Sequence, residues 1–228
     1  MTTPENFSER VPVEQEAINE LLLCVSTGFI LLMQLGFALV ENGTVRSKNS
    51  RNILTKNLFD LCIGGFIYWL IGYGIAYGGT VGGFIGTDKR YYASSGYDWI
   101  EDNQYTNWIF QFSFAATAAT IVSGSLAERT QLPAYILFSL FMTGFVYPVV
   151  VSWTWGTGWL GDGGENGETL GMHDFAGTGI VHMVGGVAGL AGAFVVGPRF
   201  GKEKNPNNEK DVKRDPSYKN LSEYGAED

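Results

Sequence analysis

The sequence predicts an all-α membrane protein with about five transmembrane helices. Apolar residues gather in five blocks of about twenty residues, which is the helix length that crosses a hydrocarbon core roughly 30 Å thick. Short polar or charged loops separate these blocks, and Lys and Arg are concentrated in alternate loops. The mean hydropathy of the whole chain, +0.04, hides this clustering because the loops offset the blocks.

The five expected spans follow one another up to Val196. They cover residues 18–40, 58–77, 108–126, 133–155 and 175–196. Residues 1–17 are then expected to form an extracellular N-terminal segment, residues 18–197 a five-helix transmembrane domain, and residues 198–228 a polar cytoplasmic tail. No basic n-region or small-residue cleavage site precedes the first span, so we expect that span to stay in the protein.

Basic residues set the expected orientation. Twelve of the 15 Lys and Arg residues lie in the loops after the first, third and fifth spans, whereas the opposite side has only Arg10, Lys89 and Arg90. Because basic loops are retained in the cytoplasm, we expect the N-terminus outside and the C-terminus inside, in the plasma membrane. A net charge of −8 without a clustered basic face argues against nucleic acid as a partner.

Ionisable residues inside the spans are the first candidates for function, because each is costly in a bilayer unless it is paired or lines a polar path. Glu20 and Glu41 lie near span ends and are expected to reach the interface. Asp60 lies about one turn into the second span, where snorkelling or pairing at the helix end is favoured. His182 lies well inside the fifth span. Its imidazole can donate and accept hydrogen bonds and can pass protons, so a functional role and a packing role both stay open.

Aromatic residues and one carboxylate form a second group of candidates at span ends. Phe110 and Phe114 are four residues apart in the third span and share a helix face. Trp155 ends the fourth span, where a ring belongs either to an interfacial aromatic belt or to a site for an ammonium-type cation. Asp174 precedes the fifth span, where a carboxylate caps a helix or attracts a cation.

The remaining notable residues are expected to be structural. Gly185 and Gly189 have the spacing that allows close helix packing in lipid. Cys24 and Cys62 lie in apolar blocks without metal-ligand spacing, and we expect buried thiols. The sequence has no nucleophile with a nearby base, no metal-ligand cluster and no phosphate-binding loop. We therefore expect neither an enzyme nor a metal or cofactor site.

Six short stretches, taken in order, resemble the ammonium transporter family (the Amt, Mep and Rh proteins). They are Val45–Asn49, Phe110–Ala115, Leu126–Arg129, Asp174–Gly177, Val181–His182 and Gly197–Arg199. Each stretch alone is a weak signal, but their order and spacing together are specific. The resemblance implies a trimer in which each subunit encloses a narrow, mostly hydrophobic pore for ammonium or ammonia.

The resemblance also implies roles for individual residues. Trp155 is expected at an outer cation-recruitment site, with Phe114 as the gate residue beside it and Phe110 as a further pore-mouth aromatic. Asp174 matches the family's acidic residue beneath the vestibule. His182 matches the first of two pore histidines.

The length of the chain departs from the family pattern. Family members have about eleven spans, and spans one to five and six to ten are inverted repeats that enclose the pore. The leading hypothesis is therefore the first half of an ammonium transporter, which assembles as a homotrimer or with a complementary half. The alternative is a non-transporting, half-length membrane subunit that senses ammonium or regulates full-length transporters.

Overall fold

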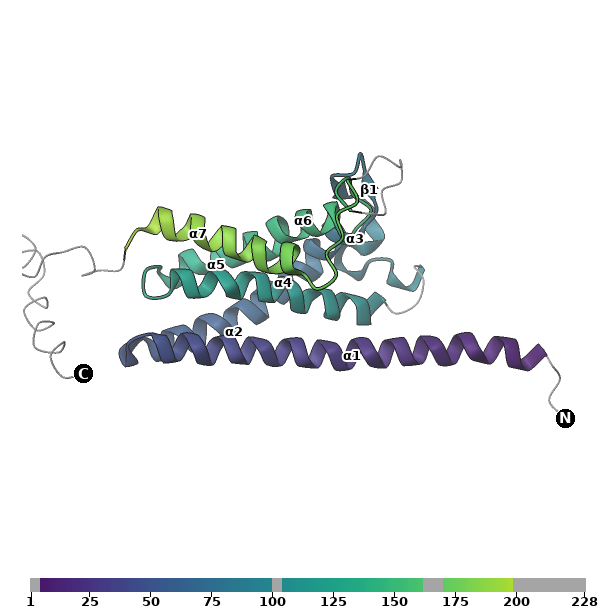
Figure 1. Ribbon diagram of the computed structural model, residues 1–228, viewed down its shortest axis with the longest axis horizontal. Helices are drawn as coiled ribbons and strands as arrows, with labels where there is room; N and C mark the ends of the chain where they lie inside the picture. The colour runs from purple at the N-terminus through teal and green to yellow at the C-terminus, as the bar shows by residue number, and fades with distance from the viewer. Residues whose placement is uncertain (1–4, 100–103, 162–169, 199–228) are drawn as a thin grey trace, which may run out of the picture.

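The computed structural model is a bundle of long helices, with α1 along one side and α4 in its middle (Figure 1). The structure describes residues 5–99, 104–161 and 170–198. The helices are α1 (Glu5–Thr44), α2 (Ser50–Ile67), α3 (Tyr73–Tyr77), α4 (Gln104–Leu126), α5 (Leu132–Phe141), α6 (Tyr147–Trp153) and α7 (Val184–Val196). Short 3₁₀ turns cover Ser47–Asn49, Lys89–Ser94 and Tyr97–Trp99, and a two-stranded antiparallel ladder joins β1 (Thr80–Val81) to β2 (Ile85–Gly86).

Five helical runs within the described residues are long and apolar enough to cross a membrane. They are Gln15–Thr44, Ser47–Tyr77, Gln104–Leu126, Leu132–Trp153 and Thr178–Val196. This confirms the predicted fold class. The second run begins eleven residues before its predicted start at Leu58, because the basic stretch that we expected as a loop is already helical. Arg46 makes the turn in extended conformation, and α2 begins at Ser50.

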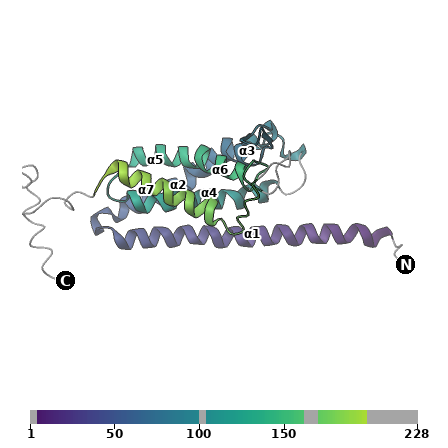
Figure 2. The ribbon, with the colours of Figure 1, turned by 45° about the horizontal axis from the view of Figure 1, so that its top comes forward.

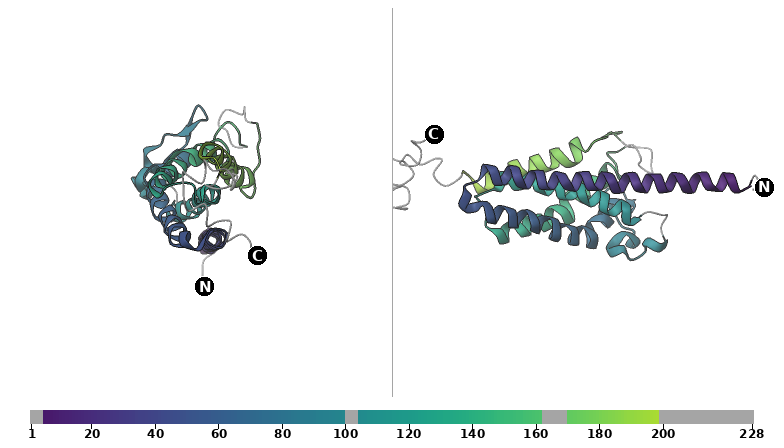
Figure 3. Two further views of the ribbon diagram at one scale, coloured as in Figure 1. Left: turned by 90° about the vertical axis from the view of Figure 1, so that its left-hand side faces the viewer. Right: turned by 90° about the horizontal axis from the view of Figure 1, so that it is seen from below.

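Helix α4 is the centre of the bundle. It packs against α1, α2 and α7, and 61% of its most apolar stretch is buried, compared with 11% for the first span and 22% for the last. Its buried side chains are mostly small: Ser113, Ala115, Ala116, Thr117, Ala118 and Ala119. Small side chains let neighbouring backbones approach closely. Figures 2 and 3 show the result, with α1 on the rim beside the other helices.

The helix backbones approach each other most clearly where α7 packs against α4. A Cβ atom placed on Gly185 would lie 2.9 Å from the Ala118 carbonyl oxygen, and one on Gly189 would lie 2.7 Å from the Ser125 hydroxyl. Both glycines are buried. The packing role expected for this glycine pair is therefore confirmed.

The end of the bundle that carries the α1–α2 turn is held by Glu128, and we call it the Glu128 end. The Glu128 Oε1 atom accepts hydrogen bonds from the Arg46 backbone N–H at 3.0 Å, the Arg46 Nε at 3.3 Å and the Asn49 amide at 2.6 Å. Burial alone would raise the pKa of this carboxyl, but these hydrogen bonds and the Arg46 charge hold the pKa below its ordinary value. The neighbouring Arg129 donates to the Gly197 carbonyl at 2.7 Å and so fixes the end of α7.

Three expectations about single residues are wrong. Glu41 does not reach the interface and is only 5% exposed, and Asp60 does not snorkel but is 2% exposed and accepts a hydrogen bond from Tyr135. Cys24 and Cys62 are exposed rather than buried. The common reason is that α1 and α2 lie on the rim. Polar side chains of these two helices point into the bundle, whereas apolar side chains on their outer faces are not covered by any other described part of this chain.

Three of the five spans contain a π-helical turn. These turns are Tyr68–Gly72 (η2), Met142–Val146 (η5) and Thr178–Met183 (η6). The first two pack against each other, and a Cβ on Gly72 would lie 2.8 Å from the Thr143 carbonyl oxygen. The third carries His182. Such turns are rare and occur often at functional sites.

The α4–α7 contact predicts a pair of contrasting substitutions. We expect Gly185→Ala to destabilise the protein by about 1–3 kcal/mol, because the added methyl group meets backbone that cannot move easily. Gly186→Ala is the matched control, since a Cβ there meets nothing within 4 Å. Thermal unfolding of the purified chain in detergent measures both. Equal melting temperatures for the two variants would contradict the close packing.

The lowered pKa of Glu128 predicts an acid-sensitive contribution to stability. A carboxyl whose folded-state pKa lies below its unfolded value stabilises the fold above the unfolded pKa, near 4.3 for Glu, and loses this effect as the pH falls through the folded pKa. We expect the wild type to exceed Glu128→Gln in melting temperature at neutral pH. The difference should shrink on acidification, and a difference independent of pH would refute the assignment.

Candidate functional site

Three aromatic rings lie together at the opposite end of the bundle, which we call the Trp155 end. Trp155 lies two residues after the end of α6, and its ring lies 5.6 Å from that of Phe114 at an interplanar angle of 67°. Phe114 in turn lies 5.0 Å from Phe110 at 84°. Both contacts are edge-to-face, the favoured geometry for aromatic pairs. All three rings are only partly buried, so part of each aromatic surface stays accessible.

Asp174 connects the aromatic group to the fifth span. Its backbone carbonyl accepts a hydrogen bond from the Trp155 indole N–H at 2.6 Å, which fixes the plane of that ring. Its carboxylate accepts hydrogen bonds from the backbone N–H groups of Thr178, Gly179 and Ile180 at 2.8–2.9 Å. These are free N–H groups at a helix start, where a carboxylate cap is favourable.

Gly177 provides the turn between Asp174 and the helix. Its φ of +74° lies in the left-handed region, which other residues rarely adopt. A Cβ at this position would also lie 2.9 Å from Val181 Cγ2 and 3.3 Å from the Trp155 ring. A glycine is therefore needed both for the backbone angle and for the approach of the indole.

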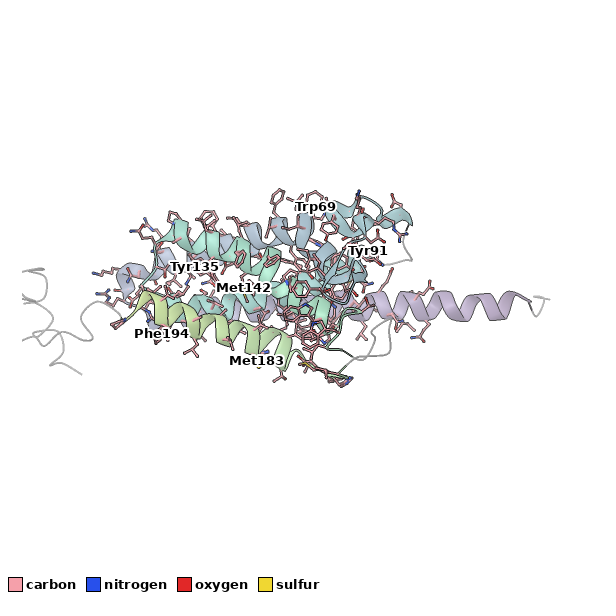
Figure 4. All side chains as sticks on the ribbon, turned by 90° about the horizontal axis from the view of Figure 1, so that it is seen from above. Trp69, Tyr91, Tyr135, Met142, Met183 and Phe194 are labelled. Atoms are coloured by element: carbon pink, nitrogen blue, oxygen red, sulfur yellow. The ribbon has the colours of Figure 1, made fainter. Side chains whose placement is uncertain are left out.

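His182 lies on an open face rather than among the aromatic rings. It is exposed, and its Nδ1 atom lies 3.3 Å from the Gly177 carbonyl oxygen. If Nδ1 carries the proton and donates it to this carbonyl, Nε2 is left as an acceptor. Figure 4 shows Met183 and Phe194 on the outward side of the same helix. The candidate site therefore has an aromatic part and a histidine part, joined through the Asp174–Gly177 turn.

The fold buries two groups of polar side chains that the sequence did not predict to come together. The first is a set of hydroxyls from Tyr68, Tyr77 and Tyr147, none of which has a hydrogen-bond partner within the described part of the chain. The second joins Glu41, Lys56 and Asp60 near the Glu128 end. A signal for the second was present, because Lys56 and Asp60 are four residues apart and so share a helix face.

The chemistry of the aromatic part suits a small cation. Indole and phenyl faces attract cations by roughly 0.5–2 kcal/mol. The Trp155 indole is hydrogen-bonded to the Asp174 backbone carbonyl, and the carboxylate of the same residue caps the start of the fifth span. Within the residues that the structure describes, no group of three His, Cys, Asp or Glu side chains has a metal-binding arrangement.

Comparison with known proteins identifies the family. The model of the Ammonium Transporter Family matches residues 21–218. The chain belongs to this family. The predicted resemblance is thereby confirmed, and the five spans together with family membership make the chain a multi-pass membrane protein.

The relatives extend this match across several lineages. Ammonium transporter 1 member 1 of Arabidopsis thaliana is 47% identical over 167 residues, which cover 72% of this chain and 33% of that protein. Ammonium transporter Amt1 of Haloferax mediterranei is 43% identical over 193 residues, 83% of this chain and 37% of that protein. The solved structure of a protein named Sensor Amt Protein is 33% identical with a TM-score of 0.74, and the match covers 84% of this chain and 47% of that one. The chain thus spans less than half the length of these relatives.

The hydrogen bonds of Asp174 predict a graded loss of stability. We expect Asp174→Ala to cost about 0.5–2 kcal/mol, because three backbone N–H groups lose their acceptor. Asp174→Asn keeps one side-chain oxygen and should lose less. Thermal unfolding of the three proteins in detergent tests this order. If the alanine variant melts at the wild-type temperature, the carboxylate does not act as a cap.

Proposed function

We propose that this chain takes part in the transport of ammonium across a membrane, with cation recruitment at Trp155 and conduction past His182. The contact between Trp155, Phe114 and the Asp174 turn carries the proposal, because it combines aromatic faces with a carboxylate at one end of a membrane bundle. Membership of the ammonium transporter family supports the same substrate.

Recruitment follows from the cost of dehydrating a cation. An ammonium ion that leaves water loses strong hydration, and contact with the Trp155 face offsets part of this loss. Phe114 lies against the indole and Phe110 against Phe114, so the two phenyl rings extend the apolar surface from the recruitment ring into α4. The contact between Phe114 and Trp155 supports the proposal that Phe114 acts as a gate between Trp155 and the pore.

Beyond the gate a charge is prohibitive, so the ion must give up a proton before it moves further. His182 is the proposed proton-handling group of the pore. Its interaction with the Gly177 carbonyl would orient the ring and leave Nε2 free to accept a hydrogen bond from ammonium or ammonia.

The open face of the helical run Thr178–Val196 supports completion of the pore by another protein surface. Met183, Val187, Leu190 and Phe194 are all exposed there, and His182 lies on the same helix run. A histidine is costly against lipid, whereas it is stable against a polar path or another helix. We therefore propose assembly with a complementary half or with further copies of the chain, as a trimer.

The proposal includes the placement of the chain in the cell. Residues 1–17 would be extracellular, residues 18–197 would form the transmembrane domain, and residues 198–228 would form a cytoplasmic tail at the plasma membrane. The distribution of Lys and Arg between the two sides supports this orientation. Residues 199–228 lie outside the described part of the chain.

A second candidate function is ammonium sensing or regulation by a half-length subunit. One solved relative, 33% identical to this chain, is named Sensor Amt Protein. Such a subunit would use the same recruitment site but would bind the ion without a flux of its own.

Ammonium-driven flux in liposomes separates the two functions. We expect flux from preparations in which the chain has associated with other chains, and none from monomers, because one face of the pore is then missing. Trp155→Ala should lower this flux by about two- to thirtyfold, which corresponds to the 0.5–2 kcal/mol of a cation–π contact. His182→Ala should lower it further because it removes the proton-handling group.

Matched variants exist for both substitutions. Trp159→Ala removes a partly exposed indole from the same loop, and His173→Ala removes the other histidine of the chain. Both should leave the flux unchanged. Flux that survives Trp155→Ala would contradict recruitment by this ring. A folded, associated chain that binds ammonium without any flux would favour the sensing function.

A further inference from the structure

Away from the aromatic and histidine site, the bundle encloses a cluster of charged side chains. Glu41 of α1 is 5% exposed, and Lys56 and Asp60 of α2 are 7% and 2% exposed. Tyr135 of α5 completes this group, which we call the α2 charge cluster. Figure 4 shows Tyr135 in the half of the bundle from which the chain leaves after α7.

Lys56 has partners on several sides. Its Nζ atom donates to the Ser123 carbonyl at 3.1 Å, lies 3.6 Å from Glu41 Oε2, and sits 4.7 Å from the centre of the Tyr135 ring. Glu41 Oε2 also accepts a hydrogen bond from the Asn57 amide at 2.8 Å. The single ammonium group of the cluster is thus already paired with Glu41.

Asp60 is held differently. Its Oδ2 atom accepts a hydrogen bond from the Tyr135 hydroxyl, whereas its Oδ1 atom has no hydrogen-bond partner in the described part of the chain. Ser139 lies beside this carboxyl, and its hydroxyl is also buried without a partner in the same set of residues. Two buried polar atoms at this carboxyl therefore lack a hydrogen bond to any other described group, which is uncommon in folded proteins.

The charge count of the cluster does not balance. Two ionised carboxylates and one ammonium group leave one negative charge, buried inside a membrane-spanning bundle. An unpaired charge is costly to bury, so a group in that position is expected to change its protonation state and become neutral. One bound proton removes the imbalance.

We propose that Asp60 is a proton-binding site that holds one proton on Oδ1 at neutral pH. Asp60 is the better position than Glu41, because Glu41 has the ammonium group and the Asn57 amide as partners, both of which stabilise an ionised carboxylate. A protonated Asp60 becomes a donor and can donate a hydrogen bond to the Ser139 hydroxyl while it still accepts one from Tyr135.

The groups that face Asp60 agree with this placement. The titratable groups around it are Glu41 from α1, Lys56 from α2 and Tyr135 from α5. Helix α4 contributes the Ser123 carbonyl, which accepts from Lys56, rather than a charge. Lys56 is therefore the one cation of this cluster, and the two carboxyl groups of Glu41 and Asp60 share it.

Two cavities bring protons within reach. One, of about 280 Å³, lies at the Glu128 end, and its lining includes Arg46, Lys48, Lys56 and Tyr135. A second, also of about 280 Å³, lies between α1, α2 and α4 and reaches Asp60. Since Tyr135 contacts Asp60 directly, a proton can pass between the first cavity and the carboxyl through the phenol. The site therefore exchanges protons with the Glu128 side of the membrane.

Infrared spectroscopy of the purified chain in lipid tests this proposal without reference to transport. A protonated carboxylic acid has a carbonyl-stretch band that ionised carboxylates lack, and the band shifts in heavy water. We expect this band at neutral pH in the wild type, its loss in Asp60→Asn, and its retention in Glu41→Gln. Lys56→Gln should about double the band area, because removal of the cation forces a second carboxyl to bind a proton.

The wild-type spectrum keeps the test decisive if a variant does not fold. A wild type without the band at neutral pH, or a band that survives Asp60→Asn, would overturn the assignment. Titration toward alkaline pH should abolish the band while the flux variants Trp155→Ala and His182→Ala leave it unchanged. Failure of the transport proposal and failure of the proton site are thus distinguishable.

Discussion

Close approach of helix backbones around α4 is the constraint on which the other contacts depend. A row of alanine, serine and threonine side chains keeps this helix narrow, and α7 approaches it at Gly185 and Gly189. In lipid, apolar surface gains little by meeting other apolar surface, so packing contacts of this kind hold helices together. With α4 in place, Phe110 and Phe114 project at one end and Glu128 clamps the other.

Much of the candidate site could be predicted because most of its residues lie in short ordered stretches. Motif order points to Asp174 and His182, and the position of Trp155 at the end of the fourth span points to the indole. The structure adds the turn at Gly177 that joins them. The positions of the spans followed from hydropathy, except at the start of the second span, where charged residues led us to expect a loop. The stretch from Arg46 to Lys56 reads as a basic loop, yet its later residues face inward from α2.

The α2 charge cluster shows why the rest could not be predicted. A position in the sequence gives the depth of a residue along its helix, but not the side of the helix that meets the bundle. Their positions along the sequence suggested that Glu41 and Asp60 lie near the membrane interface. The orientation of α1 and α2 about their own axes instead points both side chains into the bundle. The same orientation leaves Cys24 and Cys62 on the outer face.

The three π-helical turns have a consequence for how these spans tolerate changes of length. Each π turn amounts to one residue inserted into an α-helix, which rotates every later side chain by about 100° relative to the earlier ones. In the fifth span the extra residue lies between the residues capped by Asp174 and Gly185, which contacts α4. The π turn therefore sets the angle about the helix axis between the capped end and the face that packs on α4. A regular α-helix of the same sequence would have a different angle. Deletion of one residue within such a turn would therefore leave a regular helix rather than a broken one. It would also rotate one end of the span relative to its neighbours. The turns in question are residues 68–72, 142–146 and 178–183.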